Sequence, residues 1–243
     1  MSDAATSEAA ARRALAVERL RPADFDAIRA LHARVLDRLP SPTLLKPEPA
    51  ELHRYALDPA NGAILGVRHP ERPTALVAYG IVLTRLYPGD ATGDGLRMEP
   101  GERLGKVLGG NVDPAWRGHG LQRRLIDERT RLAAAADVVH VYSTAAPENG
   151  VSWRNLVRCG FRIFRLDLRY GTMLRYLLYR RTDTPAPPPA PPVAWLPETA
   201  VEEIRAALAD GLIGSSVRER AGGFDLGLAD ERGSPDLSAL ARA

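Results

Sequence analysis

A glycine-containing segment in the middle of the chain has the residue types of an anion-binding loop. Its sequence is Arg117-Gly-His-Gly-Leu-Gln122, and it lies between an apolar segment and the start of a predicted helix. Glycines allow the backbone to turn tightly and to approach a ligand closely. The first turn of a helix offers unpaired N–H groups and the positive end of the helix dipole, and an arginine adds a forked, charged donor. This combination predicts a site for a phosphate-sized anion.

Three widespread motifs do not fit the segment. A dinucleotide-binding fingerprint needs a third glycine where this chain has Arg123. A P-loop ending in Gly105-Lys106 would need glycine in place of Pro100 and serine or threonine in place of Val107. The Gly-x-Ser-x-Gly nucleophile elbow of many hydrolases is also absent from the sequence. These three motifs therefore do not identify a ligand for the loop, and a structural turn between a strand and a helix is the alternative to an anion site.

The residues around the loop indicate the elements that position it. The pattern predicts a strand over Leu104–Val112, a helix over Leu121–Ala135, a strand over Val138–Ser143 and a short helix over Asn149–Arg158. Upstream, a helix is predicted over Pro22–Leu39. The further strands expected are Ala16–Leu20, Ala63–Val67, Ala75–Leu83, Phe161–Arg169 and Met173–Arg181. This order predicts an α+β fold with a mixed sheet.

The charge distribution and the prolines divide the chain into unequal parts. The net charge is only +3, but residues 1–182 carry 28 basic and 20 acidic groups, whereas residues 198–243 carry 5 and 9. Between them, residues 183–197 hold seven of the 20 prolines and are expected to form a semi-rigid linker. We expect a flexible N-terminus over 1–14, a main domain over 15–182 and a small C-terminal appendage over 198–243.

The appendage is predicted to contain one helix and a hairpin. Thr199 to Glu202 fits a capping box, and strands are expected over 217–220 and 224–228. So few elements are marginal alone. We therefore expect the acidic appendage to fold back onto the basic body, near its binding cleft.

Composition excludes several classes of protein. With 45% hydrophobic and 26% charged residues, the chain is not wholly disordered. A single cysteine, Cys159, excludes an internal disulfide and a cysteine-based zinc cluster, and is expected to be a small buried side chain. No apolar run has the length of a membrane span, and the N-terminus lacks the features of a secretory signal. The basic residues are scattered, which argues against nucleic-acid binding. A cytoplasmic protein is expected.

Two segments together resemble a known family. The stretch from Val112 to Leu125 is similar to the acyl-CoA-binding motif of the GCN5-related N-acetyltransferases (GNAT). The stretch from Asn149 to Phe161, an asparagine-led helix ending in Gly-Phe, resembles the second motif of that family. The interval between them fits one helix and one strand, as the family's fold requires. The resemblance covers roughly residues 16–181.

The resemblance implies a site for acetyl-CoA or another acyl-CoA, without a metal. The strand before the loop would splay from its neighbour, and the pantetheine arm would lie in the gap against backbone groups of Asn111 and Val112. The side chains of Asn149 and Ser152 would contact the pantetheine or the adenine side. The pyrophosphate would bind the loop amides of Arg117, Gly118, His119, Gly120, Leu121 and Gln122.

Two positions depart from the family's pattern. Gln122 replaces the usual glycine or alanine, so its side chain must point away from the phosphates. Leu156 replaces the usual tyrosine that protonates the leaving thiolate. Tyr142 is our substitute for the acid, although packing is its more common role and solvent is the alternative. Glu99 and Glu102 are the candidates for the base.

The resulting hypothesis is an N-acyltransferase. It would transfer acetyl from acetyl-CoA to a primary amine of a small molecule by direct attack in a ternary complex. The pairs Tyr170-Gly171 and Arg175-Tyr176 join two late strands that border the acceptor site in this family, although structural pairing explains them equally well. The alternative is an acyl-CoA sensor or assembly module of the same fold with little activity. The resemblance leaves open a homodimer.

Overall fold

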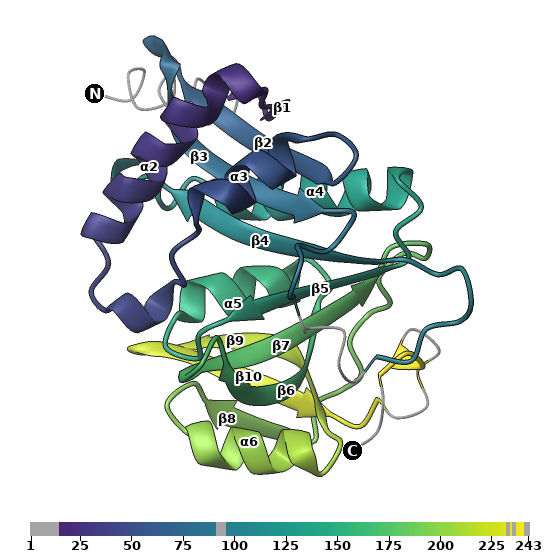
Figure 1. Cartoon of the computed structure of the whole chain (residues 1–243). Coiled ribbons are helices and arrows are strands. Elements are labelled where there is room, and N and C mark those ends of the chain that lie inside the picture. The colour runs from purple at the N-terminus through teal and green to yellow at the C-terminus, as the bar shows by residue number, and fades with distance from the viewer. Residues whose placement is uncertain (1–14, 91–95, 232–233, 235–236, 241–243) are drawn as a thin grey trace.

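In the computed structural model, residues 15–90, 96–231, 234 and 237–240 are described, so the predicted flexible N-terminus 1–14 lies outside the described residues. The chain forms a ten-stranded mixed sheet in the order β1-β2-β3-β4-β5-β7-β6-β9-β10-β8 (Figure 1). The strands are β1 (Glu18–Arg19), β2 (Gly62–His69), β3 (Arg72–Leu83), β4 (Leu104–Val112), β5 (His140–Ala145), β6 (Arg162–Arg169), β7 (Met173–Arg181), β8 (Ala194–Pro197), β9 (Ile213–Arg220) and β10 (Gly223–Ala229). The helices are α2 (Phe25–Asp37), α3 (Ala50–Leu57), α4 (Leu121–Ala135), α5 (Gly150–Arg158) and α6 (Val201–Ala209).

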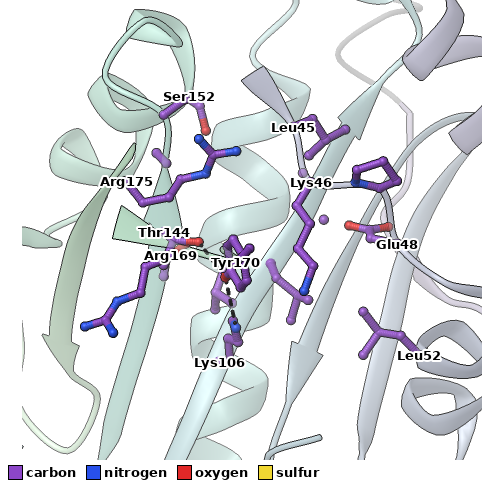
Figure 2. A pocket seen from close by; sticks show the side chains of 18 of the residues that line it. Leu45, Lys46, Glu48, Leu52, Lys106, Thr144, Ser152, Arg169, Tyr170 and Arg175 are labelled. Atoms are coloured by element: carbon purple, nitrogen blue, oxygen red, sulfur yellow. Dashed lines mark hydrogen bonds between the residues drawn. The ribbon is translucent and has the colours of Figure 1, made fainter. Parts of the chain in front are cut away.

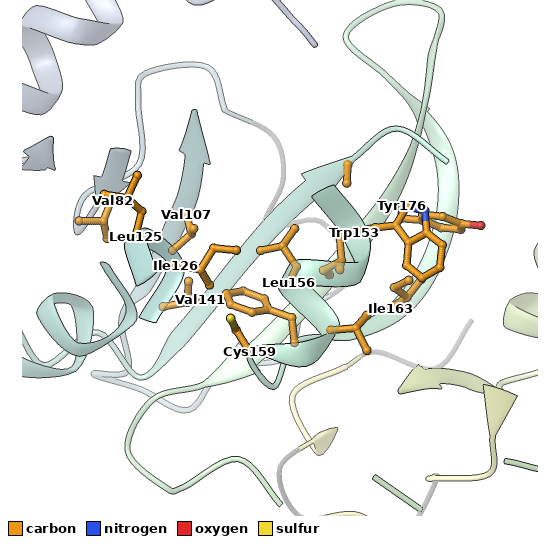
Figure 3. Close-up of a cluster of buried hydrophobic side chains, with 14 of the residues drawn as sticks. Val82, Val107, Leu125, Ile126, Val141, Trp153, Leu156, Cys159, Ile163 and Tyr176 are labelled. Carbon is orange, nitrogen blue, oxygen red and sulfur yellow. The ribbon is translucent and has the colours of Figure 1, made fainter. Parts of the chain in front are cut away.

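The helices cover both faces of the sheet. Successive side chains of β2 point to opposite faces of the sheet. Ile64 packs with the core residues of α2 and α3, while Ala63 and Leu65 pack in the core beneath α4. The core beneath α4 also contains Trp153, Leu156 and other residues of α5 (Figure 3). The sheet therefore separates an α2–α3 face from an α4–α5 face, and the predicted α+β class is confirmed.

Two adjacent central strands separate along their length. β4 and β5 form the one parallel pair among the described strands, and their pairing covers only Leu104–Lys106 opposite His140–Tyr142. β4 continues to Val112 and β5 to Ala145 beyond this short register. The two strands therefore open a gap in the sheet.

A β-bulge shapes the wall of this gap. Tyr79 of β3 pairs with Asn111, whereas Ile81 pairs with Leu108, so that two residues of β4, Gly109 and Gly110, lie opposite one residue of β3. Gly109 has a φ of 63°, a left-handed conformation that favours glycine. The bulge turns the backbone of β4 at the point where it leaves β5.

The elements predicted around the loop agree closely with the structure. The strand over Leu104–Val112 and the helix over Leu121–Ala135 have the predicted bounds, while β5 begins and ends two residues later than predicted. The predicted helix over 22–39 begins with a 3-10 turn and continues as α2.

The C-terminal appendage extends the main sheet. β9 pairs with β6 through Ile163 and Gly214, and α6 contributes Ile204 to the core that contains α4 and α5. β8 occupies residues 194–197, where the sequence predicted the end of a linker, and pairs with β10. The predicted capping box is not formed, because Ala200 is the N-cap of α6 and no side chain caps it. The appendage and the body thus share one core.

Candidate active site

A cavity of about 580 Å³ occupies the gap between β4 and β5 (Figure 2). On the α4–α5 face its wall includes Gln122, Ile126, Arg129, Asn149, Ser152 and Leu156. On the α2–α3 face its wall is built by the loop between α2 and α3, the loop after β3 and the β6–β7 hairpin. No described residue after Arg175 lines it, so the appendage does not border this cavity as the sequence analysis expected.

The glycine loop lies next to the cavity, at the start of α4. Gly118 and Gly120 have φ values of 82° and 72°, and a β-carbon on either would meet no atom within 4 Å. Gly120 is the N-cap of α4, and no side chain caps this helix end. The N–H groups of the first turn of α4 therefore have no side-chain cap and lie next to open space. A helix start of this kind can bind an anion.

Several predicted contact residues have defined partners. The Oε1 atom of Gln122 accepts a hydrogen bond of 2.7 Å from Nδ2 of Asn155, which ties this side chain to α5. The Oδ1 atom of Asn149 accepts a hydrogen bond of 3.2 Å from the backbone N–H of Ser152 and so caps α5. Gln122, Asn149 and Ser152 line the cavity. Asn111 is fully buried, and it and Val112 lie outside the lining.

Tyr142 and Glu102, predicted as acid and base, are placed away from the cavity wall. The Tyr142 hydroxyl donates to Oδ1 of Asp90 at 2.7 Å, and Tyr142 is not among the lining residues. Glu102 lies 2.7 Å from Nε2 of buried His140 and 3.6 Å from Arg181. Leu156 does line the cavity, where it presents no hydroxyl. Cys159 is buried, and burial raises the pKa of its thiol to about 12, so it is a packing residue as expected.

Tyr170 presents a hydroxyl group to the cavity. It lies in the β6–β7 turn with a φ of 53°, and its hydroxyl is 3.1 Å from Oγ1 of Thr144 at the end of β5. The Nζ atom of Lys106 donates to the same hydroxyl at 3.3 Å, and Nζ of Lys46 lies 4.1 Å from the centre of the Tyr170 ring. Figure 2 shows Tyr170 in the middle of the cavity. In the sequence, only the Tyr170-Gly171 turn pointed to this position.

Glu48, which the sequence analysis did not select, supplies a buried carboxylate to the part of the wall formed by the loop between α2 and α3. Its side chain is 6% exposed and lies on the loop between α2 and α3. The Oε2 atom accepts a hydrogen bond of 2.7 Å from the hydroxyl of Tyr79 and lies 2.8 Å from Nε2 of His53. Its Oε1 atom lies against Gly109, where a β-carbon would collide with it. One carboxylate oxygen is thus held by two donors, while the other faces the bulge of β4.

The surrounding side chains form one consistent proton arrangement. The backbone N–H of Glu48 donates to Nε2 of His32 at 3.0 Å, which leaves the proton of neutral His32 on Nδ1, 3.0 Å from the Tyr79 hydroxyl. Burial lowers the pKa of His32, which favours this neutral form. Burial and the adjacent Glu48 raise the pKa of Tyr79 well above its usual value, so its hydroxyl remains a donor to Glu48.

A buried arginine of α4 packs against the bulge of β4. Arg129 of α4 is 1% exposed, and its Nη1 donates to the backbone oxygens of Leu108 at 2.5 Å and Ile81 at 3.2 Å, the residues that flank the bulge. Burial lowers its pKa to about 10. A β-carbon on Gly80 would lie 2.6 Å from Cζ of Arg129, so the glycine makes room for the guanidinium. Arg129 therefore supports the bulge.

Comparison with known proteins identifies the fold. No protein-family profile matches the chain, and no curated protein is significantly similar to it. Solved structures do match, and the chain has the fold of the GNAT acetyltransferases, which is the fold that the two sequence motifs implied.

Three solved structures illustrate the similarity. Arabidopsis thaliana NAA60 in complex with a bisubstrate analogue has a TM-score of 0.55 at 18% identity, over 69% of this chain and 97% of that one. The same enzyme in complex with acetyl-CoA has a TM-score of 0.54 at 17% identity, over 70% and 99%. A GCN5-related N-acetyltransferase from Kribbella flavida has a TM-score of 0.51 at 17% identity, over 70% and 98%. At these identities the similarity concerns the fold.

No helix in the described ranges is long and apolar enough to cross a membrane. The described residues also contain no group of three or more side chains that could hold a metal ion.

Proposed function

We propose that this protein is an acyl-CoA-dependent N-acyltransferase that transfers acetyl from acetyl-CoA to the primary amine of a small molecule. The observation that carries the proposal is the cavity in the gap between β4 and β5, with the uncapped start of α4 beside it. A long, thin acyl-pantetheine arm fits such a gap, and the glycine loop is suited to the pyrophosphate.

The cosubstrate would enter from the α4–α5 face. The amides of residues 117–122 would bind its pyrophosphate, with Arg117 as a charged contact, and the backbone of Asn111 and Val112 would pair with the pantetheine. Asn149 and Ser152 would contact the same arm at the start of α5. Because the Gln122 side chain is bound to Asn155, it leaves its own backbone N–H accessible to the phosphates.

Catalysis would proceed by direct attack of the neutral amine on the thioester carbonyl. A C–N bond forms, the C–S bond breaks, and the amine loses a proton while the departing thiolate gains one. Glu48 is our candidate base, because Oε1 faces the bulge while Tyr79 and His53 hold Oε2. Tyr170 is our candidate acid because its hydroxyl reaches the cavity at the end of β5. Tyr142, which donates to Asp90, is the alternative acid to be tested beside it.

The proposal is tested by binding and by thiol release. Acetyl-CoA should raise the melting temperature, and CoA should be released on incubation with a panel of amines. Glu48→Gln should lower kcat by about 10²–10⁴-fold with little change in acetyl-CoA affinity. Glu51→Gln, an exposed acid on α3, is the matched control. The kcat values of Tyr170→Phe and Tyr142→Phe then decide between the two candidate acids, because only loss of the acid should lower kcat. Absence of any thermal shift with acetyl-CoA or longer acyl-CoAs would exclude the function.

One observation favours the alternative of an acyl-CoA sensor or assembly module. Leu156 lines the cavity at the position where the resemblance places the thiolate-protonating tyrosine. A sensor would bind acetyl-CoA and show a thermal shift. It would release no CoA with any amine, including peptides that have a free N-terminal amine. CoA release on the amine panel distinguishes the two functions.

A further inference from the structure

We infer that the acceptor carries an oxyanion, a carboxylate or a phosphate, in addition to its amine, and that Arg175 and Lys46 bind this group. The inference rests on the proposed function and names the substrate class of the same cavity. Both residues line the cavity on its α2–α3 face, Arg175 in the β6–β7 hairpin and Lys46 in the loop between α2 and α3. We call this face the acceptor side, because the cosubstrate would enter from the other face.

Arg175 is a buried cation whose hydrogen-bond partners are all neutral. It is 3% exposed, and its guanidinium donates to the backbone oxygens of Leu174 at 2.8 Å and Thr43 at 2.7 Å, and to Sδ of Met173 at 3.3 Å. Within the described residues, no carboxylate forms an ion pair with it. A buried charge is costly unless an opposite charge compensates it. Burial lowers the pKa of this guanidinium, and the more distant Glu148 and Tyr170 oppose that shift without forming an ion pair with it. Arg175 therefore lacks an anion that a ligand in the cavity would supply.

Lys46 adds a second positive charge near the same space. It is exposed and extends from the loop, with Nζ 4.1 Å from the centre of the Tyr170 ring. In the view of Figure 2, Arg175 and Lys46 lie on either side of Tyr170, with their side chains in the cavity. An oxyanion beside Tyr170 would face a guanidinium and an ammonium group, an arrangement that favours charge-assisted hydrogen bonds.

The other charged groups of the wall already have partners. Lys106 pairs with Asp90 at 2.7 Å. Arg169 lies 3.5 Å from Asp167. The remaining carboxylate, Glu48, is held by Tyr79 and His53 on the bulge side. Arg129 also has only backbone carbonyls as hydrogen-bond partners, but it lies on the α4–α5 face beneath the bulge. On the acceptor side, the positive charges without an ion pair among the described residues are therefore those of Arg175 and Lys46.

The cosubstrate would not supply the missing anion. In the proposed complex its phosphates lie at the start of α4, outside the gap, and the pantetheine arm that enters the gap is uncharged. The acceptor is the remaining component. Its amine would approach Glu48 and the bulge, while its oxyanion would lie near Arg175 and Lys46, so the cavity would select a molecule with both groups.

The test compares matched acceptors. Thiol release from acetyl-CoA is measured with an amino acid, its amide, its decarboxylated amine and an aminoalkyl phosphate of similar length. For the wild type, kcat/KM should be more than tenfold higher for one of the anionic amines than for its neutral partner. Arg175→Gln should reduce that ratio about tenfold, Lys46→Gln should reduce it less, and Arg175→Lys should retain part of it. Arg72→Gln, at the exposed start of β3, is the control.

The ratio is read within each variant, so a general loss of activity does not affect it. If Arg175→Gln does not fold, Lys46→Gln and Arg175→Lys still report on the site. A readout without turnover is the rise in melting temperature of the CoA-bound protein with the anionic amine but not with its amide.

Three results would overturn the inference while leaving acyl-CoA-dependent N-acyl transfer intact. The first is equal activity with neutral and anionic amines, and the second is a ratio unchanged by Arg175→Gln and Lys46→Gln. The third is a preference for a dicarboxylic acyl-CoA that Arg175→Gln removes, because the anion would then belong to the acyl group. Failure of the proposed function itself is distinct, since acetyl-CoA would then neither bind nor release thiol.

Discussion

The Oε1 atom of Glu48 lies so close to Gly109 that a β-carbon at position 109 would collide with it. Gly109 also has a φ of 63°, which side chains rarely adopt. The carboxylate proposed as the base and the bulge of β4 therefore depend on each other. The loop between α2 and α3 can place Glu48 here only because β4 has no side chain at this point.

Gly109→Ala should consequently impair both stability and activity. Strain from the left-handed backbone should cost about 1–3 kcal/mol, and displacement of Glu48 should lower kcat further. Gly222→Ala is the control for strain alone, because Gly222 has a φ of 81° and an added β-carbon would meet no atom within 4 Å. Urea denaturation and thiol release measure the two effects. Equal loss of stability and full activity in both variants would contradict the proposed contact.

Arg129 and Gly80 should be energetically coupled. Arg129→Met leaves the carbonyls of Leu108 and Ile81 without their buried donor, at a cost of about 1–3 kcal/mol for each. Gly80→Ala should be strongly destabilising in the wild type, because the new methyl group collides with the guanidinium. The same change should be milder in the Arg129→Met background, with a coupling of about 1 kcal/mol or more. Additive losses in a urea double-mutant cycle would argue that Arg129 does not fill this space.

The folded state should lose stability in mild acid through His32. Burial lowers the pKa of His32. The negative charge of Glu48 raises it in part, whereas His53 and Arg29 lower it further. The unfolded chain binds a proton on this residue below about pH 6.5, whereas the folded chain resists it, so stability is full above that pH and falls as the pH decreases. His32→Gln should reduce the slope of melting temperature between about pH 7 and 5. An unchanged slope would mean that His32 is not held neutral.

The appendage should unfold together with the body. Leu226 of β10 is fully buried in the core that contains Ile163 and Phe161. Leu226→Ala should cost about 2–5 kcal/mol and lower the midpoint of a single transition. Val193→Ala, at a side chain that is 67% exposed, is the matched control. A separate early transition for the appendage, with the main transition unshifted, would show that it is an independent unit.

The local pattern of the sequence was sufficient for the central part of the fold. The strand over 104–112, the loop and the helix over 121–135 follow from apolar spacing and glycine positions within about thirty residues. The buried state of Cys159 was also anticipated from its residue type. β8 was missed because the surrounding prolines mask a short strand that forms by pairing with β10, far along the chain. The linker predicted over 183–197 therefore ends in ordered structure.

The sequence alone determined the α+β class, the strand–loop–helix unit and the residues of the two motifs, because these depend on contacts between neighbours in the chain. Only the tertiary structure decided which side chains face the cavity. Glu48, Tyr170 and Arg175 come from a loop, a turn and a late strand, and they meet because β4 and β5 separate in the sheet. No local pattern encodes that meeting, since it arises from strand order and from a bulge whose glycine admits the Glu48 carboxylate.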